Sequence, residues 1–229
     1  MEKNHDNRSS ILVLCLISMV YLTFALACDL LAYKILKFGN WPIIGASILF
    51  PMTYAFMDFI SEIYGNHIAK IVIWFHVFCD FLFTYIICWI IHLPSPDFWH
   101  YQEAYNQVID PMARLYTANF LGMITSALLN IFILRKLRIF TQGKYYWIRS
   151  FISIAISITI YTLITDLLAY NLTATKDILT ELTLVNLISN ISFAFFYSGI
   201  FSLFVRPTLR FIGDYHLRNP VRLFNNDKV

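Results

Sequence analysis

The 229-residue chain has few charged residues. Asp, Glu, Lys and Arg make up 14% of it, against about 25% in an average soluble protein. Hydrophobic residues make up 59%, and the mean hydropathy is +0.63. A soluble domain of this length has too little interior to bury so much apolar surface. The composition therefore predicts a polytopic membrane protein built only from helices.

Several motifs that carry chemistry are also missing. The four cysteines form no Cys-x-x-Cys pair and no Cys/His group with metal-ligand spacing, so we expect neither a metal nor a cofactor. No Walker-type phosphate loop, His-Glu-x-x-His or Gly-x-Ser-x-Gly occurs, which argues against an ATPase or an intramembrane enzyme in this chain. There is no basic stripe with interleaved aromatics, and we therefore expect no nucleic-acid partner.

Six apolar segments are long enough to cross a bilayer core at about 20 residues each. The predicted spans are 11–31, 43–64, 68–91, 112–134, 147–170 and 182–205. The first is longer than a typical signal-peptide core, and we predict an uncleaved helix. The chain is thus predicted to be a single domain over residues 1–229, a bundle of six transmembrane helices.

The positions of the basic residues predict the orientation. Thirteen of the 17 Lys and Arg fall on the N-terminus, the segment after the second span, the basic loop 135–149 and the C-terminal tail. Such an excess marks cytoplasmic segments, so both termini are predicted to be cytoplasmic in the cell (inner) membrane. The loop 93–111 has no Lys or Arg and would lie outside. Its aromatic residues fit either an interfacial belt or a lid.

The segment Phe50–Gly65, FPMTYAFMDFISEIYG, has two acids in an otherwise apolar run. Asp58 and Glu62 are four residues apart and would share one helix face. Acids inside a membrane span are costly and usually face a protein interior or a water-filled path. The pair therefore indicates either a polar path or ligand site, or simply a helix end at the interface.

Other polar residues fall at membrane depth. His76, Asp80 and Thr84 repeat at helical spacing in the third span. A histidine next to a mid-membrane carboxylate is a candidate proton relay, and its alternative is a hydrogen-bonded pair that holds helices together. Asparagines in the fourth and sixth spans together suggest a polar cavity: Asn119, Asn130, Asn186 and Asn190.

A short internal repeat links the first and fifth spans. The sequence Asp29–Tyr33 recurs as Asp166–Tyr170. Transporters contain parallel repeats, although a match this short in a Leu-rich chain also arises by chance. As a true repeat it would place Asp29 and Asp166 at equal depth, near the outer face.

The run Phe50–Tyr54, followed by Asp58, Glu62, Tyr64 and Gly65, resembles the FPxTY–D–E–YG motif of the queuosine precursor transporter family. That family has also been described as vitamin uptake transporters. Trp147-Ile148-Arg149 after the basic loop fits the same pattern, and Arg114 resembles the arginine that opens the family's fourth span. The resemblance implies uptake of 7-cyano-7-deazaguanine or a related 7-deazapurine.

The chain departs from the family pattern at positions that the resemblance assigns to the substrate site, so it would be a divergent member. The family usually has Asn where this chain has Asp29, and Asp where it has Asn130. Ile158 and Tyr161 stand in place of the family's Gln and Asp, and Asn190 in place of its Lys. The candidate substrate-binding residues are Asp29, Tyr54, Asp58, Glu62, Arg114, Asn130, Arg149, Tyr161, Asp166 and Asn190, with His76 and Asp80 as proton-relay candidates.

The chemistry of these residues is compatible with a purine-like ligand. A carboxylate accepts two adjacent N–H groups of a guanine-like edge, and aromatic rings stack on a flat heterocycle. Arg149 has an alternative role as an anchor at the cytoplasmic interface.

Two functions fit these features: a secondary carrier with proton coupling as a hypothesis, and a substrate-binding membrane subunit of an ATP-driven vitamin or nucleobase uptake system. The sequence leaves the coupling ion, an ATPase partner and a homo-oligomer open.

Overall fold

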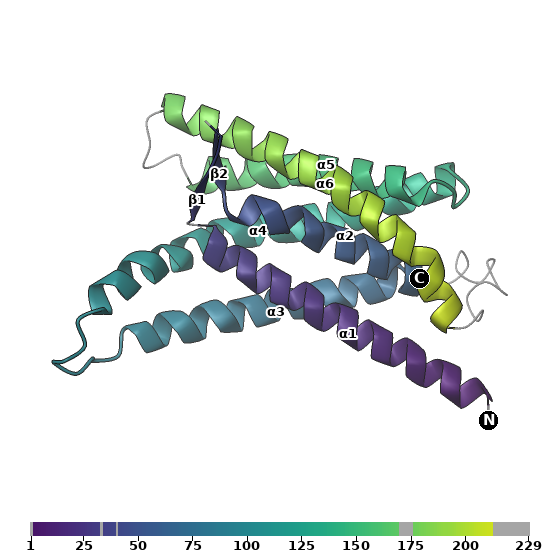
Figure 1. The fold of residues 1–229 in the computed structure, drawn as a ribbon, viewed down its shortest axis with the longest axis horizontal. Helices are drawn as coiled ribbons and strands as arrows, with labels where there is room; N and C mark the ends of the chain where they lie inside the picture. The colour runs from purple at the N-terminus through teal and green to yellow at the C-terminus, as the bar shows by residue number, and fades with distance from the viewer. Residues whose placement is uncertain (1, 33, 40, 170–175, 213–229) are drawn as a thin grey trace.

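The computed structural model describes residues 2–32, 34–39, 41–169 and 176–212, and for some of these the backbone alone. Its elements are α1 (Glu2–Leu31), β1 (Ile35–Phe38), β2 (Trp41–Ile44), α2 (Ala46–Tyr64), α3 (Asn66–Ile91), α4 (Gln102–Phe140), α5 (Tyr146–Ala169) and α6 (Lys176–Ile212). The helices run lengthwise in one elongated bundle (Figure 1). The predicted helical, polytopic membrane class is confirmed.

Five of the described helices are long and apolar enough to cross a membrane. Their apolar stretches are Ser10–Leu31, Asn66–Ile91, Asn119–Phe140, Tyr146–Thr165 and Thr183–Ile212, in α1, α3, α4, α5 and α6. α2 is not among them, since Pro51, Asp58 and Glu62 lower its hydropathy. A sixth crossing by α2 therefore stays a prediction.

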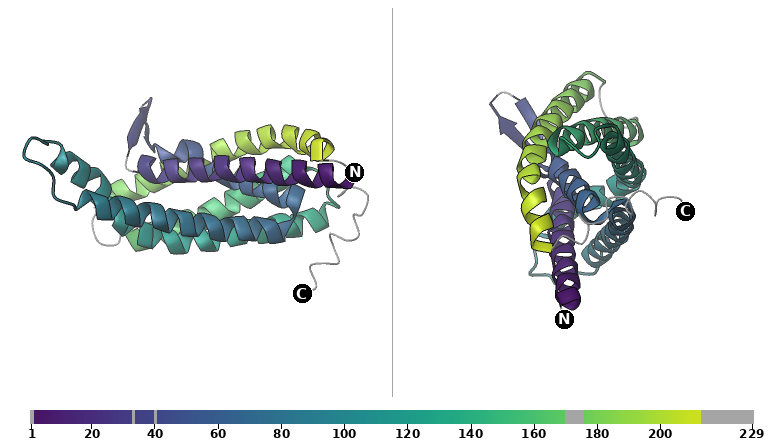
Figure 2. Two further views of the ribbon diagram at one scale, coloured as in Figure 1. Left: turned by 90° about the horizontal axis from the view of Figure 1, so that it is seen from below. Right: turned by 90° about the vertical axis from the view of Figure 1, so that its right-hand side faces the viewer.

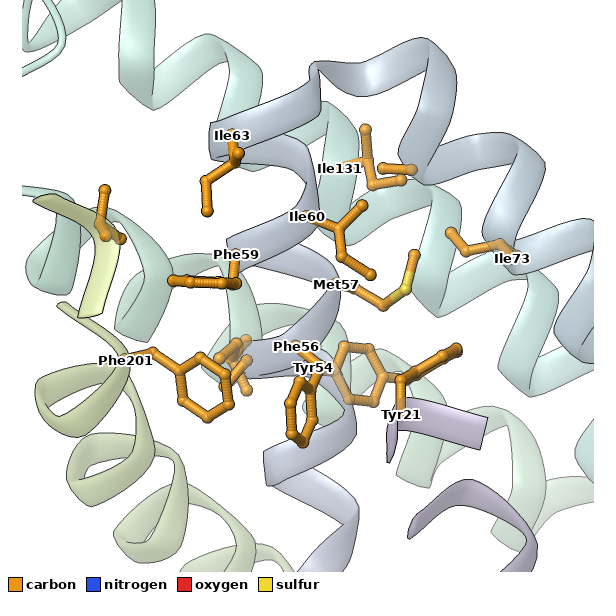
Figure 3. Close-up of a cluster of buried hydrophobic side chains, with 14 of the residues drawn as sticks. Tyr21, Tyr54, Phe56, Met57, Phe59, Ile60, Ile63, Ile73, Ile131 and Phe201 are labelled. Carbon is orange, nitrogen blue, oxygen red and sulfur yellow. The ribbon is translucent and has the colours of Figure 1, made fainter. Parts of the chain in front are cut away.

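α2 is the central helix of the bundle. It contacts each of the other five helices, and twelve of its 19 residues are buried. Figure 3 shows Phe59 and Ile60 of α2 surrounded by Phe201 of α6, Ile131 of α4 and Ile73 of α3. Because protein rather than lipid surrounds α2, this helix tolerates the acids that a lipid-facing helix could not carry.

The outward faces of the bundle are apolar, as expected for a protein whose solvent is lipid. α3 is the clearest case, with exposed side chains at Trp74, Phe75, Phe78, Phe81, Tyr85 and Trp89. A soluble protein would not leave so many large apolar groups on one helix uncovered.

The predicted start of the second span at residue 43 is wrong, because Ile43 and Ile44 belong to a strand. They lie in β2, which pairs antiparallel with β1, with Lys37 opposite Pro42. The hairpin is tied to α2 by a hydrogen bond from the Gly45 N–H to the Lys34 carbonyl, at 2.6 Å. A side chain at Gly45 would come within 3.0 Å of that oxygen, so only glycine allows this close approach. α2 therefore begins at Ala46.

The predicted loop 93–111 is shorter in the structure, because α4 already begins at Gln102. The Gln102 side chain donates a hydrogen bond to the Ile91 carbonyl at the end of α3. The joined ends of α3 and α4 project beyond the rest of the bundle (Figures 1 and 2) and carry the exposed aromatic residues Trp99, Tyr101 and Tyr105. Most of the predicted basic loop 135–149 is likewise helical, with only residues 141–145 between α4 and α5.

The bundle has two distinct ends. The start of α1 and the end of α6 lie at one end, which we call the termini end, and the β1–β2 hairpin lies toward the other, which we call the hairpin end (Figure 2). α2 and α3 are joined at the termini end by Gly65, whose φ of +88° suits glycine. This arrangement is compatible with both termini on one side of the membrane.

We predict that the termini end is cytoplasmic, from the excess of Lys and Arg there. In a variant whose four cysteines are replaced by serine, Tyr105→Cys should react with a membrane-impermeant maleimide in intact cells. Gln142→Cys, between α4 and α5, should react only after permeabilisation. The reverse labelling pattern would overturn the orientation.

Candidate functional site

The bundle encloses a cavity of about 140 Å³ between its middle and the hairpin end. A cavity of about 150 Å³ binds benzene, so a volume of this size accommodates an aromatic ring. Every helix contributes to the wall. The lining residues nearest the termini end are Tyr21, Met57, His76, Asn130, Tyr161 and Asn190. The cavity is therefore confined to one half of the bundle.

The structure brings seven of the twelve sequence-predicted residues together at this cavity. They are Asp29, Tyr54, His76, Asp80, Asn130, Tyr161 and Asn190. Asp58, Glu62 and Arg149 are not among its lining residues. Arg114 lies on α4 and Asp166 on α5, but their side chains fall outside the described part of the chain.

Three oxygen atoms of the cavity wall lack a hydrogen-bond partner among the described residues. They are the Oδ1 atoms of Asp80, Asn130 and Asn190, whose side chains are 3%, 0% and 3% exposed. A buried acceptor without a partner costs about 1–3 kcal/mol. All three would be satisfied by a ligand that presents N–H donors.

The orientation of the asparagine side chains follows from their neighbours. The Asn190 Nδ2 donates to Asn186 Oδ1 at 3.2 Å, and the Ser47 hydroxyl donates to the same oxygen. The Asn130 Nδ2 donates to Asp58 on the side away from the cavity. Each amide nitrogen therefore has an acceptor, whereas each Oδ1 has no partner among the described residues.

An acidic group forms another part of the wall. The carboxyl groups of Asp29 on α1 and Asp80 on α3 both line this part of the cavity. The Tyr21 hydroxyl lies 2.8 Å from the His76 Nδ1, one turn along α3 from Asp80. The relay candidates His76 and Asp80 therefore lie in one polar cluster with a second acid, Asp29. The sequence pattern did not predict that Asp29 would join them.

Aromatic rings line the cavity on the hairpin side of α2. The Phe50 ring centroid is 5.2 Å from that of Tyr54 and 4.6 Å from that of Tyr161. The Tyr54 hydroxyl is 2.6 Å from the Ser126 Oγ, which fixes the ring. Such rings offer a stacking surface for a flat heterocycle.

Asp58 lies immediately on the termini side of the cavity. Its side chain is fully buried and accepts hydrogen bonds from Ser150 at 2.6 Å, Ser153 at 3.2 Å and the Asn130 Nδ2. The carboxylate thus joins α2 to α4 and α5. In this conformation its oxygens are occupied by protein donors and do not face the cavity.

Glu62 lies one turn further toward the termini end and pairs with Arg149 of α5. The guanidinium donates to both carboxylate oxygens, at 3.1 and 3.3 Å, and also to the carbonyls of Lys144 and Gly143. Arg149 is only 1% exposed. Five residues tie α2 to α5 on the termini side of the cavity, and we call them the polar lock: Asp58, Glu62, Arg149, Ser150 and Ser153.

Tyr21 and Ser47 are among the polar lining residues that the sequence did not identify. Tyr21 lies four, seven and eight residues before Ala25, Cys28 and Asp29, all of which line the cavity. That helical spacing from Asp29 would have found it. Ser47 precedes the recognised motif, and only its contact with Asn186 of α6 reveals it. Among the described residues, no three His, Cys, Asp or Glu come together as metal ligands.

We predict that Glu62→Gln lowers the thermal stability of the purified protein sharply. Removing one partner of a buried ion pair leaves the other charge uncompensated, at a cost of about 3–5 kcal/mol. Adding Arg149→Gln should recover part of the loss. Arg138→Gln is the matched control, since Arg138 lies 3.8 Å from Glu62 and is 28% exposed. Equal effects of Glu62→Gln and the control would show that the pair is not structural.

The comparison with known families is consistent with this arrangement. The model of the putative vitamin uptake transporter family matches residues 44–209, from the end of β2 almost to the end of α6. No curated protein and no solved structure matches the chain. The matched region contains α2 to α5 and most of α6, and with them the polar lock and most of the cavity wall. The chain therefore belongs to the putative vitamin uptake transporter family, as a multi-pass membrane protein.

Proposed function

We propose that the protein is a secondary carrier that imports a queuosine precursor, 7-cyano-7-deazaguanine or a related 7-deazapurine, across the cell (inner) membrane. The observation that carries the proposal is a cavity with aromatic walls whose lining residues Asp80, Asn130 and Asn190 each have a buried oxygen without a described partner. A guanine-like edge supplies the adjacent N–H donors that such a wall lacks. The resemblance of the Phe50–Gly65 segment to the queuosine precursor transporters agrees with this substrate class.

The arrangement suggests how the ligand would be held. Asp80 would accept N–H groups of the guanine-like edge, and the Oδ1 atoms of Asn130 and Asn190 would accept others. Tyr161, with Phe50 beside it, would stack on the ring. An analogue without N–H donors would leave these buried oxygens unpaired and would bind much more weakly.

Transport requires that the cavity open alternately to the two sides of the membrane, and the polar lock would be the barrier on the termini side. Asn130 belongs to both parts, because its Nδ2 donates to Asp58 and the residue also lines the cavity. A ligand that forms a hydrogen bond with the Asn130 side chain would therefore contact the same amide that binds Asp58 of the lock. We infer that ligand binding changes the stability of the lock through Asn130.

We predict that the purified chain in liposomes takes up a 7-deazapurine without an added ATPase, and that Asn190→Ala reduces uptake. Losing one buried hydrogen bond to the ligand should weaken apparent affinity by roughly tenfold. Asn106→Ala, on the projecting part of α4, is the matched control. Uptake that appears only with an ATP-driven partner would favour the substrate-binding subunit instead. If the native protein takes up none of the 7-deazapurines tested, this substrate class is rejected.

We also predict that uptake is coupled to protons through His76 and Asp80. Asp29, His76 and Asp80 line the same cavity, and the His76 Nδ1 lies 2.8 Å from the Tyr21 hydroxyl. Asp80→Asn should therefore retain substrate exchange but lose accumulation driven by an imposed pH difference. Proteoliposomes with and without that pH difference measure both activities. If the native protein accumulates the substrate equally with and without the pH difference, then His76 and Asp80 only hold the helices together.

A further inference from the structure

Gly122 of α4 forms a close contact with α5 beside the cavity. It is buried, and its neighbour Met123 lines the cavity. A β-carbon at Gly122 would lie 2.9 Å from Thr165 Cγ2 and 3.3 Å from Tyr161 Cδ2. Tyr161 and Thr165 both belong to α5, and both line the cavity. The absence of a side chain at position 122 therefore lets two residues of the cavity wall approach α4.

Thr165 cannot easily turn its methyl group away from Gly122. Its hydroxyl donates to the carbonyls of Tyr161 at 2.9 Å and Thr162 at 3.2 Å. A branched side chain has few rotamers in a helix, and rotating the methyl group would also move the hydroxyl away from these carbonyls. A carbon–carbon distance of 2.9 Å is well inside the optimal separation of about 3.5–4.0 Å. A side chain at position 122 would therefore force α5 itself to shift.

The same contact determines where the Tyr161 ring lies. One edge of the ring lies beside Gly122, and its centroid is 4.6 Å from that of Phe50 on α2. The ring therefore has a neighbour that it would meet if it were displaced from α4. Because protein interiors are close-packed, such a displacement changes the shape of the cavity. Helix formation does not account for a glycine at this position, since glycine is a poor helix former.

We propose that Gly122 determines the size of the ligand that the cavity admits. It acts through Tyr161 and Thr165 and is therefore a positioning residue. With glycine at position 122, both residues lie back against α4, and the cavity of about 140 Å³ has room for a two-ring heterocycle with a substituent. A side chain there crowds the α5 wall and leaves room only for a smaller ring. The choice of heterocycle rests on the proposed function, whereas the size limit rests on the contact between α4 and α5.

Calorimetry on the purified full-length protein in lipid nanodiscs tests the proposal with two probes that differ in one group. 7-Cyano-7-deazaguanine carries a nitrile that 7-deazaguanine lacks. Gly122→Ala should weaken binding of the larger probe by about tenfold, equivalent to about 1.4 kcal/mol, and of the smaller probe by less than about threefold. Gly199→Ala is the matched control, because a β-carbon at Gly199 of α6 would have no atom within 4 Å. It should bind both probes like the native protein.

A second substitution tests whether the effect passes through α5. Thr165→Ser removes the methyl group at 2.9 Å and keeps the hydroxyl. Added to Gly122→Ala, it should restore most of the affinity for the larger probe, and Thr165→Ser alone completes the double-mutant cycle. Tyr161→Leu removes the ring and should shift the ratio of the two affinities toward the larger probe. This last variant decides the matter if Gly122→Ala binds neither probe, and an unchanged ratio would then overturn the inference.

The outcomes separate the size limit from the proposed function. Two further probes lie outside the 7-deazapurine class: hypoxanthine has two rings and uracil has one. If the native protein binds no 7-deazapurine but Gly122→Ala weakens hypoxanthine more than uracil, the substrate class is rejected and the size limit stands. If the native protein binds both 7-deazapurines and Gly122→Ala weakens them equally, the size limit is overturned and the substrate class stands. If the native protein binds none of the four probes, both are rejected.

Discussion

The buried carboxylate of Asp58 is the constraint around which the bundle is arranged. A carboxylate inside a membrane protein is tolerated only when its oxygens accept hydrogen bonds from other protein groups. Its donors come from Asn130 of α4 and from Ser150 and Ser153 of α5. α2 must therefore lie against both helices, which takes it away from lipid and into the centre. The remaining helices can then present apolar faces outward, and α2 keeps a composition that would not be stable at the lipid boundary.

The same contacts connect the cavity to the polar lock. Asn130 lines the cavity, and its Nδ2 donates a hydrogen bond to Asp58 of the lock. Glu62 and Arg149 extend the lock by one turn with a bidentate ion pair. A buried pair of this kind contributes little net stability relative to apolar packing, but breaking it is costly. It therefore suits a barrier that is either closed or open, with few intermediate states.

The charges of the bundle interior are separated along its axis. The described cations Arg138 and Arg149 lie at the lock, where Glu62 balances them, whereas the cavity holds Asp29 and Asp80. Asp29 is also a position where the chain departs from the family it resembles, which usually has asparagine there. One added carboxyl group has a large electrostatic effect in a buried cavity, because the dielectric there is low. Family membership and substrate preference are thus separate questions for this chain.

The sequence by itself determined the membrane class, the approximate helices and the pairing of Asp58 and Glu62 on one face of α2. These follow from hydropathy and from the 3.6-residue helical period, which are local properties. The family motif was likewise identified from one short segment, Phe50–Gly65. The β1–β2 hairpin and the early start of α4 were missed, because short polar and aromatic segments give no comparable periodic signal.

Only the tertiary structure decided which acids face the cavity and which face protein. Asp58 and Asp80 are both acids at membrane depth, and no local pattern distinguishes them. Asp58 accepts hydrogen bonds from serines of α5, whereas Asp80 lines the cavity together with Asp29 of α1. The difference depends on which helices pack against α2 and α3, and that packing is set by contacts between segments far apart in the chain.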